Sequence, residues 1–308
     1  MASKKKTGIR KRPAATTAGL SVATCQFPVE ADIASNRNYV LRQMRRAAEL
    51  GARVVHFSEC ALSGYAGVEF ESLESMDWDL LKSATQDIMQ MAKSLGVWVL
   101  LGSTHQLSAK NKPHNCIYVI DDQGAIVERY DKRFCTGTDG KSPTLDLIHY
   151  SPGNHMTTFE IDGFQCGVLI CYDYRFPELY RELQQDGVQV LFQSFHNART
   201  TVVEDQQYNI WKTIVPSTMA CRAAENHFWI SANNSTAYPS RWGSFLVRPD
   251  GAIVDKLPLH KATVMVNKIF FDDSFYDAPG PWRDRAIAGV LHSGCTVKDK
   301  RSVNRTII

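Results

Sequence analysis

Short apolar segments in this chain are joined in two ways, some through amphipathic helices and others through tight hairpins. A strand predicted at Leu20–Cys25 is followed by a helix from Ser35 to Leu50, which Gly51 ends. A second strand follows at Arg53–Phe57. Because a strand–helix–strand unit places its two strands parallel, the N-terminal part of the chain predicts a parallel pair.

The remaining elements repeat these two patterns. Hairpins are predicted where two apolar runs flank a turn, and helices where apolar residues recur every three or four positions. Further strands are predicted at Val97–Gly102, Cys116–Ile120, Ala125–Tyr130, Thr158–Ile161, Gln165–Ile170, Val188–Gln193, His227–Ala232, Gly243–Val247, Ala252–Lys256 and Thr263–Lys268. Further helices are predicted at Leu81–Leu95, Pro177–Asp186 and Glu204–Asn226, the last broken or kinked at Pro216, and residues 133–154 are predicted to form a loop. Parallel and antiparallel pairs in this number predict an α/β fold with two layers of mixed β-sheet covered by helices.

Charge is distributed unevenly along the 308 residues. Residues 1–19 contain six basic and no acidic side chains, whereas the remainder contains 29 basic and 32 acidic ones. We expect residues 1–19 to be a disordered basic tail. The mildly acidic body has no basic stripe with interleaved aromatics, so we do not expect nucleic acid as a partner.

Other sequence features exclude several classes of protein. No apolar run approaches the ~20 residues that span a bilayer, and the N-terminus has no signal-peptide core. The eight cysteines form no CxxC pair, which predicts reduced thiols in a cytoplasmic protein. The nine histidines form no HExxH pattern, and His149 and His155 have no cysteine partner at zinc spacing, so we expect neither a metal nor a cofactor.

Cys171 stands at the end of an apolar run, Val168–Ile170, shortly before the helix that Pro177 opens. Backbone N–H groups point outward at such a junction and favour an anion, either a thiolate or an oxyanion. A small core hydrophobe is an equally good interpretation of the cysteine alone. Three charged residues follow closely and favour a functional site. They are Asp173, Arg175 and Glu178.

Glu59, Lys132 and Cys171 each follow a predicted strand, and strand ends of α/β folds converge on one cleft. There a partly buried Glu59 would take the thiol proton and later activate water. Lys132 and the backbone N–H of Tyr172 would stabilise an oxyanion. A buried Glu59–Lys132 ion pair with Cys171 as core filler is the alternative.

Strings around these three residues resemble motifs of one known family, the carbon–nitrogen hydrolases of the nitrilase superfamily. The strings are F-S-E-C-A-L-S-G-Y (57–65), Y-D-K-R-F (130–134) and C-G-V-L-I-C-Y-D-Y-R-F-P-E-L-Y-R (166–181), supported by S-P-G (151–153), R-A-A-E-N (222–226) and G-S-F-L-V-R-P-D-G (243–251). The resemblance implies a four-layer αββα sandwich that dimerises through helices near the active site. It also implies a thioester at Cys171, loss of ammonia, and hydrolysis by water that Glu59 activates.

One position departs from the family pattern. The family often has a second glutamate shortly before the S-P-G string, and here the nearest acid is Asp146, which either substitutes for that glutamate or is a solvated loop acid. Arg175 is a candidate for binding a substrate carboxylate, unless it forms a structural pair with Asp173 or Glu178. Asn197 completes the candidates for oxyanion or substrate binding.

The Cys171 string resembles the omega-amidase branch more than the carbamoylputrescine amidase or aliphatic nitrilase branches. We therefore expect hydrolysis of a small linear amide, with release of ammonia, by a homodimer or higher homo-oligomer. An N-carbamoyl amide hydrolase is one alternative, and a catalytically silent binding protein on the same fold is another. The catalytic domain is predicted to span residues 20–268, and residues 269–308 to form an extension that packs on the domain or on a dimer partner.

Overall fold

Two six-stranded sheets form the centre of the molecule. The computed structural model describes residues 19–108, 110–197, 210–270, 274–306 and 308. The first sheet has the order β12 (Thr263–Ile269), β1 (Leu20–Gln26), β2 (Val54–His56), β3 (Trp98–His105), β4 (His114–Ile120) and β5 (Ile126–Asp131). The second has the order β11 (Ile253–Lys256), β10 (Phe245–Val247), β9 (Trp229–Asn233), β8 (Val190–Ser194), β7 (Phe164–Ile170) and β6 (Thr158–Ile161).

Both sheets are mixed, as the sequence predicts. Strands β1, β2 and β3 pair in parallel, and so do β7, β8 and β9, whereas hairpin partners at the edges pair antiparallel. The inner faces of the two sheets pack on each other through a core in which Val22 and Leu100 come from one sheet and Val168 and Phe192 from the other. The carboxyl ends of the parallel strands therefore lie at one edge of the sandwich.

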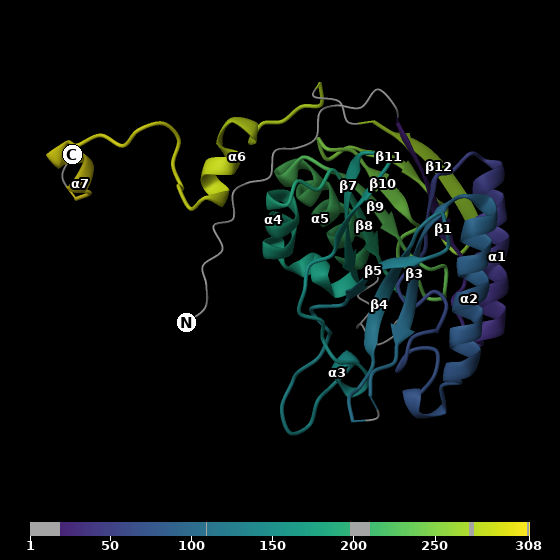
Figure 1. Ribbon diagram of the computed structural model, residues 1–308. Helices are drawn as coiled ribbons and strands as arrows, with labels where there is room; N and C mark the ends of the chain where they lie inside the picture. The colour runs from purple at the N-terminus through teal and green to yellow at the C-terminus, as the bar shows by residue number, and fades with distance from the viewer. Residues whose placement is uncertain (1–18, 109, 198–209, 271–273, 307) are drawn as a thin grey trace.

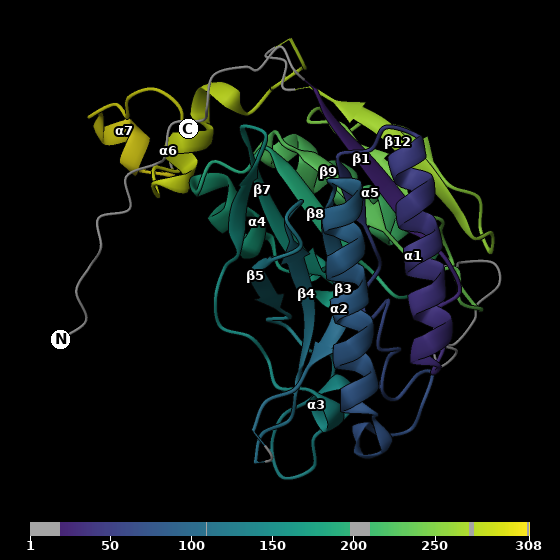
Figure 2. The ribbon, with the colours of Figure 1, turned by 45° about the vertical axis from the view of Figure 1, so that its right-hand side comes forward.

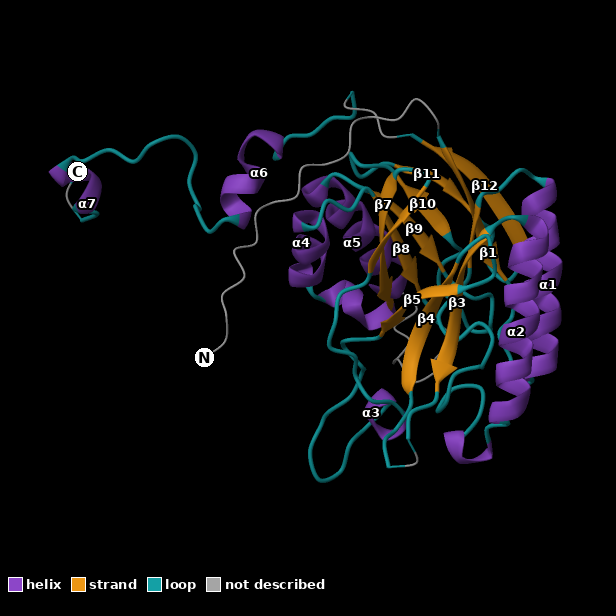
Figure 3. Ribbon diagram, in the orientation of Figure 1, coloured by secondary structure: helices purple, strands orange, loops and turns teal. Residues whose placement is uncertain are grey.

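Helices cover the outer faces of both sheets (Figure 3), which makes the fold a four-layer αββα sandwich. The helices α1 (Ile33–Glu49) and α2 (Trp78–Leu95) lie side by side on the first sheet (Figures 1 and 2). The helices α4 (Pro177–Gln185) and α5 (Ile210–Asn226) cover the second sheet.

Two helices begin earlier than their apolar periodicity predicts. Asp32 caps α1 by accepting the backbone N–H groups of Ala34 and Ser35, so this helix starts before Ser35. Asp77 caps α2 in the same way, and Gly96 ends it in the left-handed conformation at φ +65°. The side-chain caps thus mark where the two helices start.

The structure corrects three local predictions. The loop 133–154 contains a four-residue helix, α3 (Asp146–His149). Helix α5 runs through Pro216 without a break, and Val215 and Met219 on either side of it are buried against the second sheet. Residues 204–209 of the predicted helix lie outside the described part. A 3₁₀ helix, Cys171–Arg175, separates β7 from α4, where the sequence predicts only a short connection.

The C-terminal segment lies apart from the sandwich (Figures 1 and 2). It contains α6 (Gly280–Ile287) and α7 (Lys300–Val303), and α6 is tied to the body by Arg283, which donates to the carbonyl of Glu225 and pairs with Asp277. All but one residue of the predicted basic tail lies outside the described residues. No helix in the described ranges is long and apolar enough to cross a bilayer.

Gly102 of β3 packs directly against the backbone of the segment that follows β2. A Cβ atom at Gly102 would lie 1.9 Å from the carbonyl oxygen of Ser58 and 2.8 Å from the backbone nitrogen of Cys60. Because backbone atoms cannot give way cheaply, we expect Gly102→Ala to lower the free energy of unfolding by about 3 kcal/mol, measured by urea denaturation.

Ser103→Ala is the matched control in the same strand. The Ser103 hydroxyl is buried and makes no hydrogen bond to the described residues, so its removal should change the unfolding free energy by less than about 1 kcal/mol. Equal losses in the two variants would contradict the contact that we assign to Gly102.

Candidate active site

The ends of three strands bring Glu59, Lys132 and Cys171 to the same edge of the sandwich. Glu59 follows β2, and its backbone N–H donates to the carbonyl of Phe195 in the other sheet at 3.3 Å. Lys132 follows β5, and its own carbonyl accepts from Gly153, where a Cβ atom would lie 2.2 Å from the Asp131 carbonyl. The sequence therefore places the three residues correctly with respect to the strands that carry them.

Lys132 is completely buried and uses all three of its ammonium protons. Its Nζ donates to Glu59 Oε1 at 2.7 Å, to Asp146 Oδ2 at 2.9 Å and to Tyr65 Oη at 3.1 Å. Burial by itself would lower the pKa of Lys132, but the charges of Asp146 and Glu59 raise that pKa well above its ordinary value. Lys132 therefore stays protonated as a cation between two carboxylates.

Asp146 is a buried member of this cluster and not a solvated loop acid. It begins α3, and its Oδ2 also accepts the backbone N–H of Thr136 at 3.0 Å. Leu145 just before it has φ +53°, a backbone conformation that residues other than glycine rarely adopt. The loop thus turns Asp146 inward to meet Lys132.

Glu59 is fully buried, whereas the sequence predicts partial burial. Its Oε1 accepts from Lys132 and also from Asn115 Nδ2 at 2.8 Å. Its Oε2 is buried and makes no hydrogen bond to the described residues. One carboxylate oxygen is thus anchored and the other is left to accept a proton.

Asn115 and Tyr65 are the two contact residues that the sequence reasoning missed. Asn115 begins the buried part of β4, and its carbonyl accepts the backbone N–H of Lys132 at 2.9 Å. The only sequence signal for Asn115 is the hairpin predicted around residues 121–124. This hairpin places the start of its first strand, near Asn115, opposite the end of its second strand, near Lys132. Tyr65 lies in the Glu59 string, but nothing in its spacing predicts a contact with Lys132.

Cys171 occupies a strained turn at the end of β7. Its φ of +38° is unusual for a residue with a side chain, and such strain recurs at functional sites. Although the residue keeps some exposure, burial of its thiol raises the pKa of Cys171, and the charge of Glu59 raises it further while Lys132 opposes this. The thiol is therefore the resting form, and a base must take its proton before the sulfur can attack.

Asp173 holds this turn in place. Its Oδ2 accepts from Tyr130 Oη at 2.8 Å and from the backbone N–H of Ile170 at 3.0 Å, and its Oδ1 accepts the N–H of Phe134 at 2.8 Å. These bonds tie the Cys171 turn to the strand end that carries Lys132. One of the charges that follow Cys171 therefore has a structural role.

The structure holds the remaining candidates through contacts outside the buried cluster. Arg175 is exposed, with its guanidinium 4.7 Å from the centre of the Tyr174 ring. Tyr172 meets the ring of Phe176 edge-on at 5.7 Å. Asn197 follows β8, and its backbone N–H donates to Asn234 Oδ1 at 3.0 Å. Their roles in binding stay predictions.

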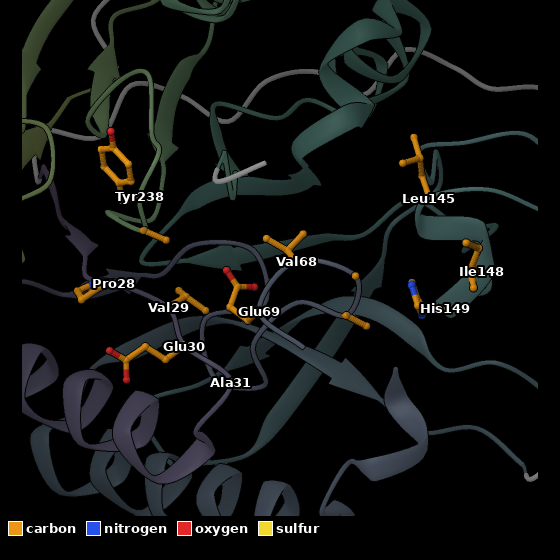
Figure 4. A pocket seen from close by; sticks show the side chains of 13 residues that line it. Pro28, Val29, Glu30, Ala31, Val68, Glu69, Leu145, Ile148, His149 and Tyr238 are labelled. Carbon is orange, nitrogen blue, oxygen red and sulfur yellow. The ribbon is translucent and has the colours of Figure 1, made fainter. Parts of the chain in front are cut away.

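A groove of about 750 Å³ is lined by chain neighbours of two cluster residues (Figure 4). Its floor is the segment 66–69 that follows Tyr65, and one wall begins at Leu145, next to Asp146. Glu69 lies near the middle of the groove and binds His196 Nε2 at 2.7 Å. The groove thus reaches the chain neighbours of two residues that contact Lys132.

Neither a metal cluster nor a disulfide is found near this site. Within the described ranges no group of three or more His, Cys, Asp or Glu side chains could hold a metal ion. All eight cysteines are free thiols. The side chains of the cluster can transfer protons, and the Cys171 thiol can act as a nucleophile.

Comparison of sequences identifies one family and several named relatives. The profile described as "Carbon-nitrogen hydrolase" matches residues 21–273. Human omega-amidase NIT2 is 27% identical over 256 residues, which cover 79% of this chain and 86% of that protein. Human deaminated glutathione amidase is 29% identical over 180 residues, covering 55% of this chain and 54% of that protein.

Solved structures share the fold. An amidase from Nesterenkonia sp. superposes with a TM-score of 0.70 at 18% identity, covering 90% of this chain and 99% of that one. Glutamine-dependent NAD+ synthetase from Acinetobacter baumannii superposes with a TM-score of 0.64 at 21% identity, covering 83% of this chain and 46% of that one.

Asp173 should make stability depend on pH. Burial raises the pKa of Asp173 from 3.8 to about 6, so between these pH values the folded state binds more protons than the unfolded state. The contribution of Asp173 to the unfolding free energy is therefore present at low pH and falls by about 3 kcal/mol as the pH rises to 6.

Wild type should accordingly lose about 2 kcal/mol relative to Asp173→Asn between pH 4 and 6.5, measured by urea denaturation. Asp284→Asn, at an exposed position of α6, is the control and should give a curve parallel to that of wild type. A parallel curve for Asp173→Asn as well would refute the assignment.

Proposed function

The chain belongs to the carbon–nitrogen hydrolase family of the nitrilase superfamily, and on that basis we propose that it hydrolyses small linear amides and releases ammonia. The observation that carries this proposal is the buried contact of Lys132 with Glu59 and Asp146 beside the strained turn of Cys171. Such an arrangement pairs a nucleophile with a base and with a cation that can stabilise an oxyanion.

In the first step Glu59 Oε2 takes the proton of the Cys171 thiol as sulfur attacks the amide carbon. The carbon–sulfur bond forms and the carbonyl π electrons move to oxygen. Negative charge thereby moves from Glu59 to the oxyanion, so the net charge of the buried site does not change. This conservation of charge lowers the cost of the step in a site that excludes water.

Lys132 is the group that we assign to the oxyanion. Of its three bonds, the one to Tyr65 is the longest, at 3.1 Å, and goes to a neutral partner. That proton can turn to a developing oxyanion while the bonds to Glu59 and Asp146 keep the ammonium in place. The donor is therefore positioned before the reaction, which is where its catalytic value comes from.

In the second step the intermediate collapses and Glu59 gives its proton to the amide nitrogen, which leaves as ammonia. A thioester on Cys171 remains. Glu59 then takes a proton from water as the hydroxyl oxygen attacks the thioester, and the carbon–sulfur bond breaks. The thiolate recovers the proton from Glu59, and a carboxylic acid is released.

Asp146 takes the place of the second glutamate that the family resemblance implies. It shares Lys132 with Glu59, and its backbone support from Thr136 keeps it aimed inward. A buried ammonium with a single carboxylate partner would be less constrained than one held from two sides. We assign to Asp146 the role of orienting Lys132.

The names of relatives support a small amide as substrate. Two of the relatives are named omega-amidase and deaminated glutathione amidase, and a mutant of the Nesterenkonia amidase is known in complex with butyramide. In a mutant of that enzyme the acetamide moiety of fluoroacetamide is attached to the active-site cysteine. The groove beside Tyr65 and Asp146 is the route by which we expect such a molecule to enter.

The C-terminal extension supports a second part of the proposal, that the protein is a homodimer or larger homo-oligomer. Tyr276, Leu291 and Val303 are each more than 70% exposed on it, at 76%, 83% and 78%. The segment that carries them lies apart from the sandwich, and we propose that it packs on a second copy of the chain. We also propose a cytoplasmic location, which the eight free thiols support.

Ammonia release from a panel of small amides, omega-amides, N-carbamoyl amino acids and nitriles tests the function. We expect release from the linear amides and a loss of more than roughly 10³-fold in Cys171→Ala and Glu59→Gln, because each removes a group that makes or breaks bonds. Cys221→Ala is the control, since Cys221 is exposed on α5.

A fully active Cys171→Ala variant would disprove the thioester mechanism. Absence of ammonia from every compound, with Cys171 alkylated no faster by iodoacetamide than Cys221, would favour a silent binding protein. Release from the N-carbamoyl compounds alone would point to ureido hydrolysis.

Asp146 variants test its orienting role. We expect Asp146→Asn to lower kcat/KM by roughly 10²-fold, because the ammonium loses one of its two charged partners, and Asp146→Glu to recover most of the activity. Equal kcat/KM values in Asp146→Asn and wild type, measured by ammonia release, would show that Glu59 alone is enough to orient Lys132.

A further inference from the structure

A buried imidazole bridges the two sheets close to the active-site cluster. His56 ends β2, three residues before Glu59, and is completely inaccessible to solvent. Its Nδ1 lies 2.9 Å from Ser231 Oγ in β9, and its Nε2 lies 2.9 Å from Ser194 Oγ at the end of β8. Both serines belong to the opposite sheet.

For a neutral His56 ring the hydrogen bonds allow only one arrangement of protons. Ser194 Oγ donates to the carbonyl of Phe57 at 3.0 Å, so it must accept from His56, and the imidazole carries its proton on Nε2. A neutral ring then accepts at Nδ1 from Ser231, whose oxygen can accept in turn from Thr24 Oγ1 at 3.0 Å. Burial lowers the pKa of His56 to about 3, which agrees with a neutral ring.

The bridge joins the strand that carries the base to β8, the neighbour of the strand that carries the nucleophile. Ser194 is the register partner of Ile170 in the parallel pair of β7 and β8, and Ile170 is the residue before Cys171. Directly after Ser194, the carbonyl of Phe195 accepts the backbone N–H of Glu59. One end of the bridge is thus three residues from Glu59, and the other lies beside the end of the Cys171 strand.

We propose that His56 is a positioning residue, which sets the separation of Glu59 from Cys171 through its bond to Ser194. The proposal rests on the proposed function, because it assigns to Glu59 the transfer of the Cys171 proton. An apolar side chain could fill the same space, but it would not fix how the two sheets are aligned along their strands. Hydrogen bonds at both ring nitrogens do fix it, because each has a narrow range of distance and angle.

Two variants of His56 separate positioning from simple packing. The amide of asparagine can reach the place of Nδ1, so His56→Asn keeps the bond to Ser231 and loses the one to Ser194. The amide of glutamine can reach the place of Nε2, so His56→Gln keeps Ser194 and loses Ser231. Each variant gives up one buried hydrogen bond, and we expect similar losses of thermal stability.

Their activities should differ. Because a displacement of about 1 Å costs on the order of 10²-fold in rate, we expect kcat to fall roughly 10- to 100-fold in His56→Asn, with KM within about threefold of wild type. His56→Gln should recover kcat to within about fivefold of wild type. A purely structural role predicts that both variants change activity only in proportion to their folded fraction.

The rate of Cys171 alkylation by iodoacetamide gives a readout that does not depend on the substrate. It should fall in His56→Asn and recover in His56→Gln, because removal of the thiol proton by Glu59 precedes alkylation. Equal alkylation rates in the two variants would overturn the proposal, even if wild type released no ammonia and the proposed function had failed.

A second pair of variants covers the case in which His56→Asn does not fold. Ser194→Ala breaks the link toward Cys171, whereas Ser231→Ala breaks the link on the far side of the ring. We expect slower alkylation of Cys171 in Ser194→Ala than in Ser231→Ala. The same rate in both would count against a role for the bridge in positioning.

Discussion

The ion contacts of Lys132 are the interaction on which the rest of the site depends. A buried carboxylate without a partner would cost several kcal/mol, and here two carboxylates share one interior ammonium. The partners come from three separate parts of the chain, since Glu59 follows β2, Lys132 follows β5 and Asp146 begins α3. The cation therefore stabilises the site and also holds three segments together. Burial and the charge of Glu59 raise the pKa of the nearby Cys171 thiol against the opposing charge of Lys132, so in the proposed mechanism the thiol stays neutral until Glu59 removes its proton.

Polar contacts between the sheets provide the alignment that these ionic contacts need. Most of the interface between the sheets is apolar, which stabilises the sandwich without fixing how one sheet is set along the other. At the edge that carries the site the contacts become directional. His56 bonds to both serines, and Asn233 Nδ2 donates to the carbonyls of Cys25 and His56. The fold thus combines an apolar core with a polar edge at which the reacting groups are placed.

Much of this arrangement follows from local sequence rules. Apolar runs of strand length predict most of the strands, and the junctions after them locate Glu59, Lys132 and Cys171, because strand ends in α/β folds share an edge. Local rules failed where a contact distant in sequence decides the outcome. Helix α5 continues through Pro216 because the burial of the helix outweighs the loss of one backbone hydrogen bond. The short helix at Asp146 forms within a predicted loop, because Asp146 pairs with the buried Lys132. Asn115 has no signal of its own, because its role depends on the chain that lies opposite it.

The sequence by itself determined the fold class, the family and the three residues at the strand ends, because these depend on periodicity, on motifs and on their order along the chain. Only the tertiary structure decided which neighbours those residues have. It placed Asp146 in the interior, turned Asp173 into an anchor of the Cys171 turn, and kept the thiol neutral by burying it beside Glu59. The physical reason is that ionisation and hydrogen bonding depend on distance and on exclusion of water. Both are set by how the two sheets pack, which no local stretch of sequence encodes.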